Sequence, residues 1–226
     1  MRKHFIRISP FIYFPYVEYV EILGLLFQEC QLRTDYLNPE LYNRLYSVMT
    51  YDNVLALRVS LETGLRIDDV LSLTVDNLAG RTLRGVAEKT GKPFKKTISA
   101  DLAHRLKCLA LKGYFFKHRT KPNCHRTRQA VWSNMKTAAK RLGVQLNAAP
   151  HSARKTYAVE LFHDSGLAAV QNELQHDRVS TTMLYCFSDL LVKKDPATTT
   201  YCDIEVLADK IAEKVVEKIK EKAPCV

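Results

Sequence analysis

Residues 151–185 read HSARKTYAVELFHDSGLAAVQNELQHDRVSTTMLY, and no other segment says as much about the fold and chemistry of this chain. The segment brings His151, Arg154, His176 and Tyr185 within 35 residues. A second arginine, Arg66, lies far upstream. Guanidinium, imidazole and phenol groups together suit the attack on a phosphodiester and the stabilisation of the charge that develops on it.

Each of these side chains fits one part of such a reaction. Charge builds on the non-bridging oxygens, and the planar guanidinium of Arg66 or Arg154 can bind two oxygens at once. A phenol has a pKa of about 10, so Tyr185 needs a proton acceptor such as His151 or nearby positive charge. The leaving 5′-oxygen needs a proton, for which Lys89 is the candidate. None of these steps calls for a metal ion or a cofactor, and His176 is free to hydrogen-bond the phosphate.

Taken singly, the same residues have ordinary interpretations. A tyrosine such as Tyr185 is usually a half-buried helix residue, Arg66 could form a salt bridge with Asp69, and Lys89 could be a plain phosphate contact. Their order and spacing, with a basic segment between them, argue for the catalytic interpretation.

The charge of the chain is high and localised. The 226 residues carry a net charge of +10, and the sequence pI is about 9.3. Residues 81–128 hold 14 Lys and Arg against 2 Asp and Glu, a local charge of +12. A basic segment of this kind indicates a polyanionic partner such as DNA, although a solvated basic face remains the plainer interpretation.

The cysteines and the apolar residues set further bounds. Six cysteines form no CxxC pair, so we expect a reducing, cytoplasmic compartment and no disulfide framework. The spacing of Cys108, His118, Cys124 and His125 fits no familiar zinc finger. Pro15, Glu18 and Glu21 interrupt the apolar run at 11–27, which therefore favours a core or partner-binding helix over a membrane span.

The periodicity predicts a mostly helical chain with one small antiparallel sheet. Two strands are expected around the turn Thr90-Gly-Lys-Pro93, at 83–88 and 94–98. A short helix should begin at Asp68 or Asp69 and run to Leu73. Longer helices are expected at 39–49, 51–63, 101–112, 127–142, 151–165, 168–175 and 179–186.

The same pattern suggests one domain over residues 37–190. Residues 1–36 form an N-terminal extension. Residues 191–226 hold a hinge at Pro196-Ala-Thr-Thr-Thr200 and an amphipathic helix at 203–221.

The motifs resemble those of the tyrosine recombinase, or phage integrase, family in its catalytic domain. The resemblance covers about residues 37–190 and rests on five motifs in order: Thr63-Gly-Leu-Arg66-Ile-Asp-Asp69-Val-Leu-Ser-Leu73, Glu88-Lys89-Thr-Gly-Lys92, Pro150-His151-Ser-Ala-Arg154-Lys-Thr-Tyr-Ala158, Leu174-Gln-His176 and Ser180-Thr-Thr-Met-Leu-Tyr185.

The resemblance implies a role for each active-site position. Arg66 and Arg154 would bind the scissile phosphate, and His176 would bind it too. Lys89 would be the general acid, and His151 would assist proton transfer at the tyrosine. Tyr185 would attack, giving a 3′-phosphotyrosine link and a free 5′-hydroxyl, without metal or ATP. Asp69 would support the active-site arginine.

Two departures from the family stand out. Gln175 occupies a position where the family usually has glycine. About 36 residues precede the catalytic region, too few for the N-terminal domain with which relatives clamp DNA. Phosphate binding should then depend more on the basic residues Lys92, Lys95, Lys96, Arg119, Arg126 and Arg128, or on an accessory DNA-binding protein.

The resemblance implies a DNA recombinase or integrase acting on double-stranded DNA, in a prokaryotic, viral or mobile-element context. Four protomers would assemble on two duplexes, with the 203–221 helix docking on a neighbour or packing on its own body. The alternatives are a type IB topoisomerase, which relaxes DNA as a monomer, and a DNA-binding regulator that keeps the fold. The DNA site, and the choice among integration, excision, resolution and inversion, lie beyond the sequence.

Overall fold

The computed structural model describes residues 34–189 apart from 122 and 146. The sequence-based expectations for most of the N-terminal extension and for the helix at 203–221 lie outside these residues. Within them, Thr34–Asp189 pack as one unit.

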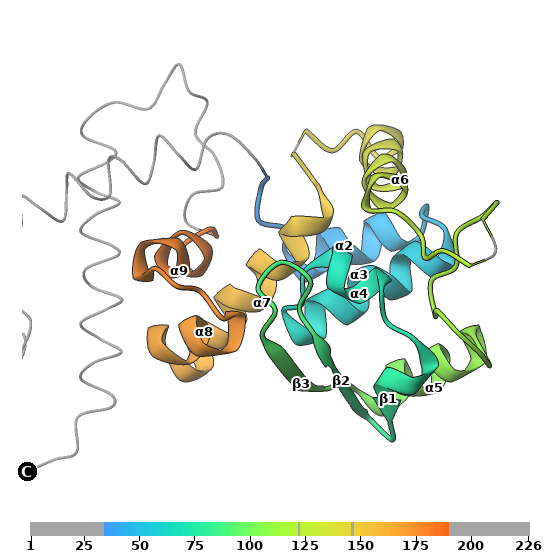
Figure 1. Ribbon diagram of the computed structural model, residues 1–226. Helices are drawn as coiled ribbons and strands as arrows, with labels where there is room; N and C mark the ends of the chain where they lie inside the picture. The colour runs from blue at the N-terminus through green and yellow to red at the C-terminus, as the bar shows by residue number, and fades with distance from the viewer. Residues whose placement is uncertain (1–33, 122, 146, 190–226) are drawn as a thin grey trace, which may run out of the picture. The chain divides into compact units, whose positions relative to one another are not determined.

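Eight α-helices and a small sheet make up the described chain (Figure 1). The helices are α2 (Pro39–Tyr46), α3 (Tyr51–Thr63), α4 (Ile67–Leu71), α5 (Ala100–Leu109), α6 (Arg128–Arg141), α7 (Pro150–Ser165), α8 (Leu167–Leu174) and α9 (Val179–Cys186). The strands are β1 (Leu78–Ala79), β2 (Thr82–Val86) and β3 (Pro93–Thr97), which follow a 3₁₀ turn at Val75–Asn77 and pair antiparallel in the order β1-β2-β3.

This architecture confirms the predicted fold class, a mostly helical chain with a small antiparallel sheet. Two details differ. Strand β1 was not predicted, because two residues are too short to show the alternation of a strand. Helix α4 begins at Ile67 rather than at Asp68 or Asp69, since Arg66 has extended backbone angles (φ −64°, ψ 148°) and is the N-cap residue itself.

Local sequence signals set several helix ends. The Asn38 side chain accepts a hydrogen bond from Leu41 N at 2.8 Å, and Pro39 occupies the first turn, where its missing N–H costs nothing. Gly64 ends α3 in the left-handed region at φ 68°. That sharp end turns the chain directly into Arg66 and α4.

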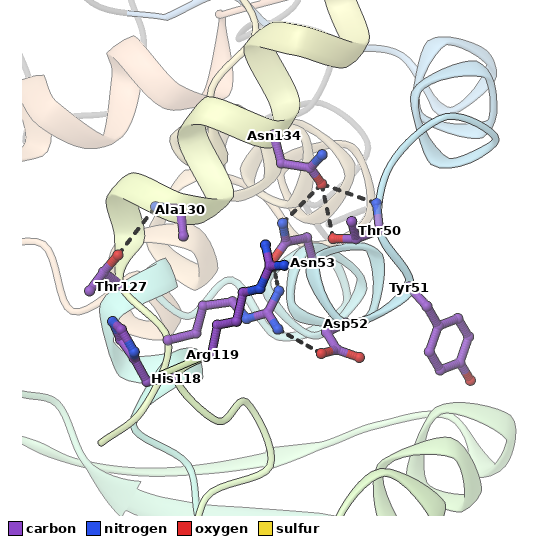
Figure 2. Close-up of a pocket in the computed structure, with 10 residues that line it drawn as sticks. Thr50, Tyr51, Asp52, Asn53, His118, Arg119, Thr127, Ala130 and Asn134 are labelled. Atoms are coloured by element: carbon purple, nitrogen blue, oxygen red, sulfur yellow. Dashed lines mark hydrogen bonds and ion pairs between the residues drawn. The ribbon is translucent and has the colours of Figure 1, made fainter. Parts of the chain in front are cut away.

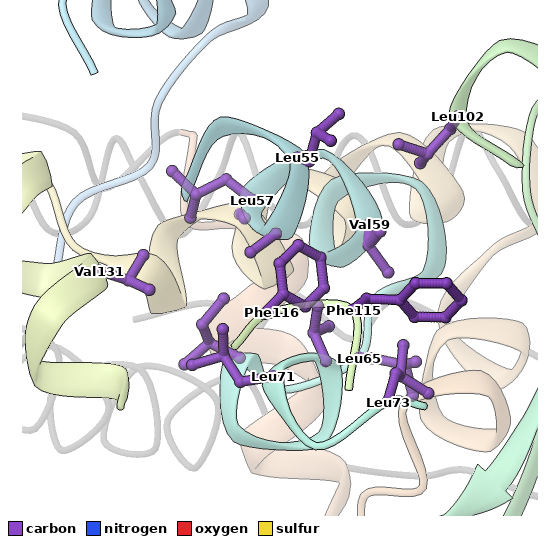
Figure 3. Close-up of a cluster of buried hydrophobic side chains, with 14 of the residues drawn as sticks. Leu55, Leu57, Val59, Leu65, Leu71, Leu73, Leu102, Phe115, Phe116 and Val131 are labelled. Atoms are coloured by element: carbon purple, nitrogen blue, oxygen red, sulfur yellow. The ribbon is translucent and has the colours of Figure 1, made fainter. Parts of the chain in front are cut away.

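Helix α3 lies at the centre of the hydrophobic core (Figure 3). Leu57 and Val59 are fully buried, and Phe115 and Phe116 pack alongside from the segment that follows α5. Burial of one such side chain contributes about 1.5–3 kcal/mol. Helix α7 packs against α3, and Arg154 near the start of α7 bonds to Gly64 at the end of α3. The fold therefore holds the two arginine motifs together.

Candidate active site

The first turn of α7 presents His151 and Arg154 on one face, because they are three residues apart in a helix. Pro150 occupies the first helical position, which suits its fixed φ. The side chain of His151 keeps an exposed face, whereas Arg154 is only 3% exposed.

Arg154 joins three segments of the chain. Its Nη1 donates to the carbonyl oxygen of Gly64, at the end of α3. Its Nη2 donates to the carbonyl oxygen of Leu174, at the end of α8, at 2.6 Å, and lies 3.4 Å from Nε2 of His176. The Nε–H of Arg154 is buried and has no acceptor among the described residues. A guanidinium held on two carbonyls, with a donor left over, is suited to receive an anion.

Burial, followed by the positive charge of Arg66, lowers the pKa of Arg154 to about 10. The group therefore stays cationic at neutral pH. The charge of Arg66 acts on Arg154, His151 and His176 alike. Arg66 thus lies in the same electrostatic neighbourhood as these three groups.

Tyr185 lies between two imidazoles. Its hydroxyl forms a hydrogen bond with Nε2 of His151. The His151 and Tyr185 rings are edge to face, with centroids 5.3 Å apart, and the His176 and Tyr185 ring centroids are 4.8 Å apart. The predicted nucleophile therefore contacts His151, the predicted proton acceptor, and His176, the predicted phosphate-binding histidine.

Both imidazoles are neutral at physiological pH. Desolvation by the surrounding protein, then the charges of Arg154 and Lys155, lowers the pKa of His151 to about 4. Desolvation and the charge of Arg154 lower the pKa of His176 to about 4 as well. A neutral His151 can accept a proton from the Tyr185 hydroxyl.

The contacts of His176 define its tautomer. Arg154 can only donate, so Nε2 of His176 is the acceptor of that contact and Nδ1 carries the proton. Nδ1–H then donates to Oγ1 of Thr182 at 3.2 Å, and Thr182 donates in turn to the carbonyl oxygen of Arg178. Thr182, fully buried on α9, was not identified from the sequence. Only its place in the Thr-Thr-Met-Leu-Tyr motif could have drawn attention to it.

Asp69 contacts the β-hairpin. The carboxylate is buried, its Oδ1 accepts the backbone N–H of Glu88 at 2.8 Å, and its negative charge acts on Arg154. Lys89 follows Glu88 and is exposed in the turn between β2 and β3. The structure thus groups Arg66, His151, Arg154, His176 and Tyr185, and it places Lys89 one residue from an Asp69 contact.

The basic residues differ in how much charge they offer to a partner. Lys96 is 7% exposed and pairs with Glu173 at 2.5 Å. Arg126 pairs with Asp52 at 2.7 Å. Lys95 and Arg119 are exposed, while Lys92 and Arg128 are exposed beside carboxylates, Asp177 at 3.0 Å and Asp68 at 3.5 Å.

A cavity of about 510 Å³ lies where α3 and α6 begin (Figure 2). Asn134 of α6 accepts from Thr50 and Asn53 at 2.9–3.1 Å, and Arg126 donates to Asn53. These bonds tie the two helix starts together, so Arg126 has a structural task here. His118 and Arg119 line the same cavity.

No group of three or more His, Cys, Asp and Glu side chains in residues 34–189 is arranged to hold a metal ion. No helix in this part of the chain is long and apolar enough to cross a membrane.

The amino-acid sequence is similar to those of known proteins of one family. The model of the phage integrase family matches residues 35–190, and the chain belongs to this family. Tyrosine recombinase XerD of Lacticaseibacillus casei is 29% identical over 137 residues, 54% of this chain and 46% of that protein. XerD of Listeria monocytogenes serotype 4b is 31% identical over 147 residues, 59% of this chain and 49% of that protein. The chain thus spans about half the length of the curated relatives it matches.

Solved structures share the fold. The catalytic domain of bacteriophage HP1 integrase superposes with a TM-score of 0.54 at 20% identity, covering 69% of this chain and 89% of that one. Lambda integrase residues 75–356, a dimer bound to a COC′ core site, gives a TM-score of 0.60 at 18% identity, covering 73% of this chain and 62% of that one. The described part of the chain therefore has the fold of a tyrosine recombinase catalytic domain.

Proposed function

We propose that this chain is a tyrosine-type site-specific DNA recombinase that cuts and rejoins strands through a 3′-phosphotyrosine intermediate. The observation that carries the proposal is the Tyr185 hydroxyl bonded to a neutral His151, beside the buried Arg154. A nucleophile, a proton acceptor and an anion-stabilising cation meet at one point, which is what attack on a phosphodiester requires.

In the proposed cleavage step, Oη of Tyr185 attacks the scissile phosphorus and its proton passes to Nε2 of His151. The bond from phosphorus to the 5′-oxygen breaks, and the ammonium of Lys89 protonates that oxygen. Arg66 and Arg154 stabilise the charge on the non-bridging oxygens, and the unsatisfied Nε–H of Arg154 is a ready donor for one of them.

Rejoining is the reverse of cleavage with a different 5′-hydroxyl. The phosphotyrosine is itself a phosphodiester, so it retains the energy of the broken bond. In this proposal the reaction proceeds without ATP and without a metal ion, because the arginines, histidines and Lys89 supply the charge and the protons.

The proposed partner is double-stranded DNA. Solved neighbours with this fold include a XerH recombinase bound to a palindromic difH substrate and a lambda integrase tetramer bound to a Holliday junction. We extend that behaviour to this chain as a homo-oligomer acting in the cytoplasm, with an accessory protein as one source of added DNA affinity. The proposed phosphate contacts are the exposed side chains of Lys92, Lys95, Arg119 and Arg128. Lys96 and Arg126 are left out, because they are less exposed and each is paired with a carboxylate.

A covalent-adduct assay tests the proposal. The chain is mixed with labelled, nicked duplexes from the DNA that flanks its own gene, and the reaction is quenched in SDS. A slow-migrating band that Tyr185→Phe lacks, with a 5′-hydroxyl at the cut, is the expected result. Tight, salt-sensitive binding without a band would instead support a regulator. Relaxation of plasmid by dilute protein, with no site preference, would support a topoisomerase.

A further inference from the structure

We propose that Gln175 is a positioning residue for Lys89, acting by fastening the turn of the β2–β3 hairpin to the α8–α9 junction. The inference rests on the proposed function, in which Lys89 is the general acid. It assigns a role to a side chain at a position where glycine would be the simpler choice.

The backbone of Gln175 has an unusual conformation for a residue other than glycine. Gln175 caps α8 in the left-handed region at φ 55° and ψ 43°. Among the described residues it is the only non-glycine with positive φ. Glycine adopts this conformation without the steric penalty that a Cβ introduces. A glutamine here therefore costs stability relative to glycine, and strain of this kind points to a task for the side chain.

The side chain of Gln175 uses both ends of its amide on the hairpin. Nε2 donates to the carbonyl oxygen of Pro93 at 3.0 Å, and Oε1 accepts from the hydroxyl of Thr90 at 3.4 Å. Thr90 and Pro93 flank the turn, and a glycine at position 175 would make neither bond. Figure 1 shows the hairpin (green) close to α7 (gold) and α8 (orange).

Both chain neighbours of Lys89 are held by hydrogen bonds to other parts of the fold. On one side, the backbone N–H of Glu88 is held by the buried carboxylate of Asp69 at 2.8 Å. On the other side, the hydroxyl of Thr90 is held by Gln175. An exposed lysine on a free turn would sample many positions, whereas one between two anchored neighbours has its Cα confined.

Two ion pairs also link these segments, and neither can replace Gln175. The pair of Lys92 and Asp177 is open to solvent, with side chains 49% and 81% exposed, so salt screens it. The pair of Lys96 and Glu173 is better buried, but it lies further along β3, away from the turn. Gln175 is the uncharged tie at the turn itself, and it directly precedes His176. The position of the general acid is thus linked to the segment that binds the phosphate.

The test compares two leaving groups in single-turnover cleavage at saturating DNA. With the natural 5′-oxygen, Gln175→Gly should cleave about 10- to 100-fold more slowly, because a small misplacement of a catalytic group costs about that much. DNA affinity and thermal midpoint should change little. Gln145→Gly, which removes an exposed loop glutamine, is the matched control and should cleave normally.

The second substrate has sulfur in place of the bridging 5′-oxygen. A thiolate leaves without needing a proton, so the general acid becomes dispensable. Gln175→Gly and Lys89→Ala should both recover to within a few-fold of the unaltered chain on this substrate, while Arg66→Ala should stay slow. Gln175→Glu keeps the length but cannot donate to Pro93, so it should share the defect of Gln175→Gly.

Three results would overturn the proposal. Normal cleavage of the oxygen substrate by Gln175→Gly would show that the tie is dispensable. Equal slowing on both substrates would mean that Gln175 acts through the phosphate-binding groups or the fold rather than through Lys89. No tyrosine-dependent adduct from the unaltered chain on either substrate would reject the proposed function itself, and the positioning role with it.

Discussion

At the scale of single residues, the site depends on histidines that stay neutral. Desolvation, followed by the charges of Arg154 and Arg66, lowers the pKa of both His151 and His176 to about 4. A histidine in an unfolded chain has a pKa of about 6.5. The unfolded state therefore binds more protons between these two pH values, and the free energy of unfolding should fall as pH drops from 6.5 towards 4.

Titration of the DNA-free protein checks this expectation. By NMR, the ring signals of His151 and His176 should show neutral imidazoles at pH 6. His151→Gln and His176→Gln assign the signals. Each should also weaken the acid sensitivity of the urea midpoint between pH 7 and pH 5. A midpoint near pH 6.5 for His151 would contradict the lowering of its pKa by the folded protein.

Arg154 holds two backbone carbonyls and, in the proposed reaction, also stabilises the phosphate, so Arg154→Lys should damage both the fold and the reaction. The guanidinium of Arg154 donates from two nitrogens to the carbonyl oxygens of Gly64 and Leu174. The single ammonium of a lysine cannot reproduce this forked geometry. We expect a loss of about 1–3 kcal/mol in unfolding free energy and a cleavage rate reduced by about a hundredfold or more. Urea unfolding and single-turnover cleavage measure the two effects separately. Near-normal turnover would contradict the phosphate-clamp role.

At the scale of elements, the end of α3 is the most constrained point near the site. A Cβ on Gly64 would lie 2.5 Å from a ring carbon of Tyr157 and 2.8 Å from a methyl of Leu174, at φ 68°. Gly64→Ala should therefore destabilise the fold by about 2–4 kcal/mol, through backbone strain and overpacking. Gly80→Ala is the matched control, since its φ is 63° with nothing within 4 Å of the added carbon. Gly80→Ala should lower the free energy of unfolding by about 1 kcal/mol. Equal losses in the two variants, measured by urea unfolding, would show that the contacts with Tyr157 and Leu174 add nothing to the cost at Gly64.

Two neighbouring lysines of strand β3, Lys95 and Lys96, were both predicted to bind phosphate, but they lie on opposite faces of the strand. Neighbouring residues of a strand face opposite sides, so Lys95 is exposed while Lys96 is buried against Glu173. Lys95→Ala should lower the salt dependence of DNA binding by about one phosphate contact and leave stability within about 0.5 kcal/mol. Lys96→Ala should do the reverse, with a loss of about 1–2 kcal/mol. Binding titrations at several salt concentrations and urea unfolding check the pair, and identical behaviour would refute the division.

Local elements of the fold could be predicted from the sequence, whereas contacts between distant residues could not. Helix α9 was predicted with its observed bounds, because Tyr185 and its neighbours form a clear local pattern. The pairing of Gln175 with Pro93, and of Asp69 with Glu88, could not be predicted, because no local periodicity records contacts between residues so far apart. The sequence thus predicts reactive groups by residue type, while the contacts that orient these side chains are visible only in the fold.

At the scale of the whole molecule, charge is the property that tests the proposed partner. Residues 81–128 carry a local +12, and the structure divides these cations. Several of them form ion pairs with carboxylates, as Lys96 and Arg126 do. Lys95 and Arg119 remain exposed. Binding through several phosphate contacts releases counterions, so affinity should fall steeply with salt.

Fluorescence anisotropy with a short duplex measures that dependence. Between 50 and 200 mM salt, we expect the association constant to fall about a thousandfold, as for about six phosphate contacts. The double variant Lys95→Ala, Arg119→Ala should reduce the slope by about two contacts. Replacing the paired Arg126 by methionine should leave the slope nearly unchanged, although it should weaken the start of α3. A shallow slope in the unaltered chain would mean that the basic segment serves solubility, because solvated cations with no phosphate to neutralise release no counterions on binding.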